Sequence, residues 1–151
     1  MATMSVQIDE KVTLNGRDFG QTRTTSITGV NTIDTRVFVA TSTEMDIIKF
    51  DSAAGNGQFI DDALKYLRIS HLSGSDDLHV RVVGTDEEYA VKVTTGGSVI
   101  FFNQGMDATQ TSTTPAVTAD GTVTINFANI NKISVDSSNA DITAEYFVAT
   151  S

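Results

Sequence analysis

The feature that most constrains this chain is a two-residue alternation of apolar and polar side chains, which recurs from one end of the sequence to the other. Near the C-terminus, for example, the apolar members of one alternating run are Ile142, Ala144, Tyr146 and Val148. Such alternation is typical of β-strands that bury one face. Turn-forming residues separate the runs at short intervals. The sequence therefore predicts an all-β fold, an antiparallel β-sandwich or jelly roll of about eight to ten short strands.

Length and composition agree with one domain built on strands. The chain has 151 residues, including 22 Thr and 13 Ser, and it has no cysteine. A chain of this length can bury a core without disulfides, and Thr, Val and Ile suit a half-buried pleated surface. We expect residues 1–10 to form an extended N-terminal arm and residues 11–151 a single β-sandwich domain. Asn15-Gly16 is a turn dipeptide near the start of the chain.

The alternation also predicts local pairing. The runs at 66–72 and 78–83, separated by a polar turn at 73–77, predict a β-hairpin, and the runs at 89–93 and 99–102 extend it to a four-stranded meander. A second hairpin is expected from 33–41 and 45–50.

Three segments are less regular. Residues 18–30 are polar and Thr-rich, so they fit either a strand with weak register or a mobile loop. Residues 59–64 have the spacing of one helical turn. Residues 105–121 contain the only proline, Pro115, and are expected to form a long loop that is functional or mobile.

The charge of the chain limits its partners. Ten Lys and Arg against nineteen Asp and Glu give a net charge of -9, which disfavours binding to nucleic acid or anionic membranes. No stretch has the apolar length of a membrane span or the pattern of a secretory signal, so we expect a soluble chain. Residues 93–151 hold only six charged side chains. This part is a candidate for subunit contacts, whose cores are poor in charge, or it is ordinary Thr-rich strand surface.

Two histidines flank an acidic turn. His71 and His79 stand on either side of Asp76 and Asp77. A zinc site needs three or four convergent ligands, so two solvent-facing histidines on a hairpin are the simpler interpretation. Either histidine would have to serve as the base of a serine hydrolase, but the sequence has no Gly-x-Ser-x-Gly elbow.

Other groups of polar residues match known types of site only in part. The run Asp86-Glu87-Glu88 supplies neighbouring carboxylates, but it is expected to be a solvated turn rather than a glycosidase pair. The segment Asp51 to Asp62 has the length of a calcium loop, but Ala53 and Gly55 occupy positions that require oxygen ligands. An irregular calcium site in a sandwich loop is kept as an alternative. The Gly55-Asn56-Gly57 run lacks the lysine and helix of a phosphate loop.

Carbohydrate binding is the best small-ligand alternative for an all-β domain. It uses exposed aromatic platforms, and this chain has no tryptophan. Tyr66, Tyr89 and Tyr146 lie within strand patterns, where packing is the commoner fate of an aromatic side chain. We therefore assign no catalytic, cofactor-binding or metal-binding residue, and we predict that the protein is not an enzyme.

A family resemblance adds to this interpretation. The runs from Tyr66 to Ser70, Leu78 to Val82, Tyr89 to Val93 and Gly96 to Asn103 form a pattern that resembles small β-sandwich virion proteins of tailed bacteriophages. The resemblance covers about a quarter of the chain and is a pattern of strands and turns. No motif in it separates head proteins from tail proteins.

The resemblance implies a capsid decoration (cement) protein, bound in many copies to the outside of a phage head. It implies a homo-oligomer, often a trimer, whose partner is the major capsid protein or another virion protein, located on the particle surface after synthesis in the host cytoplasm. No cofactor, nucleic acid or membrane is implied. A tail or fibre-associated adaptor and a carbohydrate-binding module are the alternatives. Residues 1–10 or 105–121 are the segments expected to order against the shell.

Overall fold

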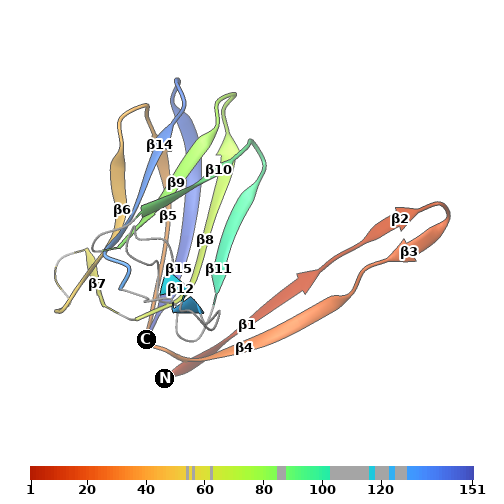
Figure 1. The fold of residues 1–151 in the computed structure, drawn as a ribbon, viewed down its shortest axis with the longest axis horizontal. Helices are drawn as coiled ribbons and strands as arrows, with labels where there is room; N and C mark the ends of the chain where they lie inside the picture. Colours follow the sequence, from red (N-terminus) through yellow and green to blue (C-terminus); the bar gives the residue numbers. More distant parts are fainter. Residues whose placement is uncertain are drawn as a thin grey trace.

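The computed structural model describes residues 1–53, 55, 57–61, 63–84, 88–102, 116–117, 123–124 and 129–151. These residues form an all-β protein, as the alternation predicts: a β-sandwich from which a two-stranded ribbon projects (Figure 1).

Two sheets make the sandwich. Sheet I has the strand order β11-β8-β15-β5, and sheet II has the order β10-β9-β14-β6-β7. Within sheet II, β7 pairs with β6 in the parallel direction. The strands of sheet I are β5 (Thr32–Ala40), β8 (Leu64–Ser73), β11 (Ser98–Phe102) and β15 (Ile142–Thr150). Those of sheet II are β6 (Met45–Asp51), β7 (Gln58–Ile60), β9 (Leu78–Val83), β10 (Glu88–Val93) and β14 (Lys132–Ser137).

The core lies between the two sheets. Leu67, Ile69 and Val148 from sheet I pack with Val80 and Val135 from sheet II, and none of the five has exposed surface. Each of these residues is an inward member of an alternating run. Burial of a side chain of this size contributes about 1.5 to 3 kcal/mol, so the alternation that predicts the strands also supplies the free energy that holds the sheets together.

The order of the strands is that of a jelly roll. With the short strand β7 set aside, the chain passes β5, β6, β8, β9, β10, β11, β14 and β15, and sheet I takes β5, β8, β11 and β15. An eight-stranded double sheet wound in this way is the jelly-roll arrangement. The structure thus selects one of the two architectures that the sequence left open.

The predicted local pairings are partly wrong. β8 and β9, expected to form a hairpin, lie in different sheets, as do β5 and β6, and β10 and β11. No four-stranded meander forms, and only β9 and β10 pair as expected. Alternation reports that a strand buries one face, but it does not report which strand lies beside it. The turn at 73–77 carries the chain from one sheet to the other.

The structure also decides between the alternatives for two of the less regular segments. Residues 22–30 form the strand β4 (Thr22–Val30), not a loop. The helical turn expected at 59–64 is wrong, because residues 58–60 form β7 and β8 begins at Leu64. The loop expected at 105–121 falls on residues outside the described ranges, except for β12 (Ala116–Val117), which pairs with β13 (Val123–Thr124).

The first thirty residues form the projecting ribbon. β1 (Ala2–Asp9) pairs with β4, and β2 (Val12–Leu14) pairs with β3 (Arg17–Phe19), in one antiparallel register that runs from Thr3 opposite Thr28 to Leu14 opposite Arg17. At about 3.3 Å per residue this paired stretch is about 36 Å long. Residues 1–10, expected to form an extended arm, are one strand of this hairpin. The dipeptide Asn15-Gly16 closes it, with positive φ angles of 51° and 74° that suit this turn type.

Candidate interaction surface

The ribbon has one apolar and one polar face. Side chains of β1 that share a face are two residues apart, so Met4, Val6 and Ile8 lie together with Ile27 of β4, and Thr25 and Arg23 are the polar members of this face. The opposite face carries only hydroxyl, amide and carboxyl side chains along the same length: Thr3, Ser5, Gln7, Asp9, Thr22, Thr24, Ser26 and Thr28. An amphipathic ribbon of this kind has a side that favours contact with protein.

The base of the ribbon packs on the outer face of sheet I. Val6, Ile27 and Val30 are buried in a cluster with Tyr66 and Ala149. The ring of Tyr66 contacts two more aromatic rings of this face, with centroid distances of 5.8 Å to Phe147 and 6.4 Å to Phe102. We call this cluster the seat of the ribbon. It is a hydrophobic contact separate from the sandwich core.

The tip of the ribbon continues the apolar face but is not covered. Val12 lies opposite Phe19 and Leu14 lies two residues beyond Val12, so the three side chains share one face. All three are more than half exposed. Figure 1 shows the tip well clear of the sandwich. Only the base of the apolar face therefore has a partner within the described part of the chain.

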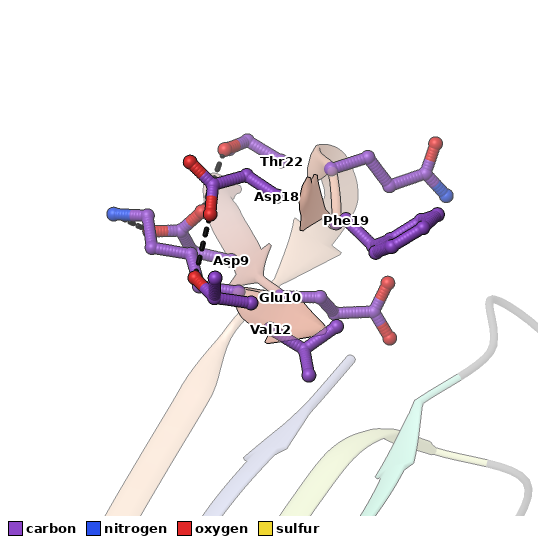
Figure 2. Close-up of a pocket in the computed structure, with 10 residues that line it drawn as sticks. Asp9, Glu10, Val12, Asp18, Phe19 and Thr22 are labelled. Carbon is purple, nitrogen blue, oxygen red and sulfur yellow. Dashed lines mark hydrogen bonds and ion pairs between the residues drawn. The ribbon is translucent and has the colours of Figure 1, made fainter. Parts of the chain in front are cut away.

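On the polar face of the tip, the side chains bond to one another. The hydroxyl of Thr13 donates to Asp18 over 2.5 Å, and the hydroxyl of Thr22 donates to Asp9 over 2.8 Å. Lys11 lies 2.9 Å from Asp9, and this ammonium, followed by the Thr22 hydroxyl, lowers the pKa of the Asp9 carboxyl from its usual value. Figure 2 shows Asp9, Asp18 and Thr22 on one side of the ribbon, and Val12, Phe19 and Glu10 on the other.

An open hollow of about 530 Å³ lies at this tip and is lined by residues 9–13 and 18–22 (Figure 2). Its lining comes from one exposed ribbon, whereas small-molecule sites are enclosed by several elements. We assign it to the twist of the ribbon rather than to a ligand. Gly20 allows this twist, with a φ of 139°, because a Cβ there would lie 1.9 Å from the carbonyl oxygen of Glu10.

A second uncovered apolar group lies on sheet I itself. Ile33, Val37 and Val39 of β5 alternate with inward residues, and each is more than half exposed. Ile33 lies opposite Ala149, a member of the seat, so the three side chains share the outer face with the seat. We call Ile33, Val37 and Val39 the β5 stripe. Among the described strands β5 pairs only with β15, and it forms one edge of sheet I.

The outer face of sheet II is of the opposite character. Lys132 lies 2.8 Å from Asp46, Arg81 lies 3.2 Å from Glu44, and Lys92 lies 3.1 Å from Asp77. The hydrogen bond from Lys132 is the main reason that the pKa of Asp46 is lowered. These ion pairs are partly exposed, so each contributes about 0 to 1 kcal/mol. They make the outer face of sheet II charged, whereas the outer face of sheet I carries exposed apolar side chains beside the Arg68–Glu145 ion pair.

The two histidines do not meet. His71 lies on β8 with its side chain buried in the interior, contrary to the expected solvent-facing pair, while His79 lies on β9 of sheet II with Nδ1 3.0 Å from Asp136. No described serine hydroxyl bonds to either ring, so the described residues show no nucleophile and base pair. They also show no group of three or more side chains placed to hold a metal ion.

The remaining candidates also stay apart. Of the acidic run 86–88, only Glu88 is described, and it lies on β10 about 3.7 Å from Arg81. Asp51 ends β6 and its carboxylate accepts a hydrogen bond from the amide of Ser52. Asn56 and Asp62 lie outside the described residues. Neither the calcium segment nor the 55–57 run can therefore be described as a site.

The three tyrosines serve different parts of the fold. Tyr146 is buried in the core, Tyr66 is buried in the seat, and Tyr89 is partly exposed on β10 with its ring 6.4 Å from that of Phe101. They do not form a shared aromatic platform. Burial is also the cause of the raised pKa of the Tyr89 hydroxyl.

The low charge of the last two strands has a structural reason. β14 and β15 lie inside sheets II and I, with a neighbouring strand on each side, and most of their side chains are buried. Six of the eleven exposed large hydrophobic side chains among the described residues lie instead at the ribbon tip and on β5, two places that the sequence did not indicate. The parity of Val12, Leu14 and Phe19 about the Asn15-Gly16 turn was the available signal.

Comparison with known proteins identifies no relative: no family model, curated protein or solved structure matches the chain. The described residues contain no helix long and apolar enough to cross a membrane. The fold and surface therefore define the class of protein here, a jelly-roll sandwich with a projecting amphipathic ribbon.

Proposed function

We propose that this protein is a non-catalytic structural protein of a virus particle, a capsid decoration protein bound in many copies to the outside of a tailed-phage head. The observation that carries the proposal is the ribbon of residues 1–30, whose apolar face is covered at its base and uncovered at Val12, Leu14 and Phe19. Monomeric proteins seldom leave such side chains together in water, and their clustering supports a role in protein contacts.

The distribution of charge supports the same role. Sheet I presents the β5 stripe beside the covered seat, while sheet II presents ion pairs such as Arg81 with Glu44. A molecule whose exposed apolar side chains lie on one side and whose ion pairs lie mainly on the other is suited to lie between a protein surface and solvent. In this arrangement sheet I and the ribbon tip face the other subunits, and sheet II faces outward.

The jelly-roll strand order is compatible with this proposal but does not carry it. Double-sheet jelly rolls occur in viral capsid proteins, lectins and cupins. Function depends on the site rather than on the fold. The resemblance of the strand pattern to phage virion proteins favours the first of these uses. A tail or fibre-associated adaptor would use the same ribbon and is the alternative.

The mechanism is passive reinforcement. A preformed sandwich bridges neighbouring subunits, and an interface of about 1,600 Å² is sufficient for specific association. Many bound copies then add avidity without any further contact. No chemical step is required, and the stability of the sandwich is what the protein contributes to the shell.

Co-sedimentation with particles from the native source tests this proposal. The wild-type protein should pellet with particles that lack it, and a variant combining Val12→Ser, Leu14→Ser and Phe19→Ser should lose at least about tenfold in affinity, or about 1.4 kcal/mol. The control variant, Ile60→Ser, changes an exposed apolar residue of β7 in sheet II and should bind normally. Equal binding by all three proteins would contradict the role given to the ribbon.

A further inference from the structure

We propose that the ribbon tip docks on a second copy of this chain, with Val12, Leu14 and Phe19 of one copy packed against Ile33, Val37 and Val39 of the other. The inference rests on the proposed function as an assembly protein and names one of its partners. It concerns two uncovered apolar surfaces, one at the ribbon tip and one on the outer face of sheet I, which lie apart within one molecule.

The donor surface is the apolar face of the tip. Its three side chains come from the paired strands β2 and β3, and the opposite face is closed by the Thr13–Asp18 and Thr22–Asp9 hydrogen bonds. The tip therefore has a defined side to present. Backbone pairing in one register with the seated base holds that side in a fixed orientation.

The acceptor surface is the β5 stripe. Eleven large hydrophobic side chains are exposed among the described residues, and six of them belong to the tip and the stripe. More than half of the exposed apolar groups are thus concentrated in two places. Beside the stripe, Glu145 is held by Arg68 over 2.6 Å, so the polar centre of this face is already paired and does not need the ribbon.

The seat shows that sheet I accepts this ribbon. Val6 and Ile27, on the same ribbon face as the tip residues, are buried against Tyr66 and Ala149. Ile33, the first residue of the stripe, lies directly opposite Ala149. The proposed contact is therefore continuous with an apolar contact that already exists in the structure, and it uses the same chemistry on both sides.

A single molecule cannot make the contact. β5 and β11 are the two edges of sheet I. Figure 1 shows the ribbon leaving the base of the sandwich and extending past β11, on the side away from β5. The tip and the stripe of one chain thus point to different neighbours. Two copies that each dock the tip on the stripe of the other, or a closed ring in which each tip docks on the stripe of the next copy, cover every tip and every stripe.

Cross-linking tests the proposed geometry directly, because the natural chain has no cysteine. Arg17 lies opposite Leu14 on the apolar face of the tip, Thr35 lies between the stripe residues, and Thr24 lies on the polar face of the ribbon. An Arg17→Cys protein mixed with a Thr35→Cys protein of different tag length should form a mixed disulfide dimer readily. A Thr24→Cys protein with the same partner is the matched control. Equal yields from the two mixtures would overturn the proposal.

Sedimentation velocity of the full chain supplies the second measurement. Wild type should sediment as an oligomer, while the triple tip variant and a Val37→Thr, Val39→Thr variant should each be monomeric with unchanged circular dichroism. A mixture of the two variants should associate again, because one supplies an intact stripe and the other an intact tip. A monomeric wild type at every soluble concentration, or a tip variant that stays oligomeric, would overturn the proposal.

These outcomes are separable from the proposed function. A protein that binds particles but never self-associates would leave the decoration role standing and remove the second copy as the partner of the tip. A protein that self-associates through the tip but is absent from particles would keep the second copy as the partner of the tip and remove the decoration role.

Discussion

The phenolic hydroxyl of Tyr146 donates a hydrogen bond of 2.5 Å to Oδ2 of Asp34, joining the core strand β15 to the edge strand β5. The ring of Tyr146 also contacts that of Phe38, at a centroid distance of 6.1 Å. Asp34 and Phe38 point toward the core side of β5, whereas the β5 stripe points outward. The contacts of Tyr146 thus hold in place the strand that presents the proposed docking surface.

Replacement of this tyrosine should destabilise the sandwich. Tyr146→Phe keeps the ring contact but removes the donor from the Asp34 carboxylate, and we expect a loss of about 1 to 2 kcal/mol in the free energy of unfolding. Urea denaturation at neutral pH measures it. An unchanged midpoint would show that the hydrogen bond does not stabilise β5.

The same tyrosine should give the protein an alkaline transition. Burial, followed by the hydrogen bond to Asp34, raises the pKa of Tyr146 from 10.0 to about 12. Because the folded-state pKa lies above the unfolded value, this contribution to stability is complete below pH 10 and is lost as the pH rises toward 12. Tyrosinate absorbance should show a phase near pH 12 that Tyr146→Phe removes. Titration of that phase near pH 10 would contradict the buried assignment.

Substitutions at two turn glycines should distinguish the cost of backbone strain from the cost of a steric clash. Gly74 and Gly96 have positive φ angles of 129° and 77°, but only at Gly74 would a Cβ meet a neighbour, lying 2.6 Å from Cγ2 of Ile142. We expect Gly96→Ala to cost about 1 kcal/mol and Gly74→Ala to cost about 2 to 4 kcal/mol, because overpacking adds to the strain. Thermal unfolding of the two variants measures the difference. Equal losses would show that the turn at Gly74 shifts freely away from Ile142.

The buried histidine is expected to lower the free energy of unfolding. His71 is 1% exposed, and neither ring nitrogen has a hydrogen-bond partner among the described residues. Leaving such a group unpaired costs about 1 to 3 kcal/mol, so His71→Leu should raise the free energy of unfolding by about 1 kcal/mol. His71→Ala, which leaves a cavity, should lower it. A destabilising His71→Leu would mean that the imidazole has a partner that contributes to the fold.

Acid should weaken the end of the sandwich where two turns meet. The carboxylate of Asp76 accepts hydrogen bonds from Asn139 Nδ2, the amide of Ala140 and the hydroxyl of Ser138. The Asn139 bond is the largest cause of its lowered pKa. A lowered folded-state pKa gives stability that is present above the unfolded value of 3.8 and is lost as the pH falls further.

Asp76→Ala should therefore have a lower melting temperature than wild type at neutral pH, and the two proteins should converge in strong acid. Differential scanning calorimetry across the acid range measures this convergence. A difference between wild type and variant that does not depend on pH would show that the Asp76 charge is not responsible.

Several elements could be predicted from the sequence because their cause is local. The alternation in β15 predicts a strand with Ile142, Ala144, Tyr146 and Val148 inward, and all four are buried. The Asn15-Gly16 turn is set by residues that accept positive φ. The pairing of β8 with β15 and β11 could not be predicted in the same way, because it depends on contacts between strands far apart in the chain.

The candidate surface was harder to predict than the fold. Val12, Leu14 and Phe19 have the alternation of a buried strand face. The alternation does not show that the sandwich covers only the base of the ribbon, at Val6, Ile27 and Val30. The stripe on β5 was hidden for a similar reason, since Ile33, Val37 and Phe38 are all apolar and the two sides of an edge strand differ only in what packs on them. Whether an apolar strand face is covered depends on what packs against it in the folded structure.

The central claim, that this protein is a stoichiometric component of a virus shell, is tested most directly by its copy number in particles. Particles from the native source are purified through a density gradient, and this polypeptide is quantified against the major shell protein by mass spectrometry. The proposed decoration role predicts a ratio close to stoichiometric, and a ratio of a few per cent would instead support the tail or fibre alternative. Absence of the polypeptide from the particles would contradict the virion assignment.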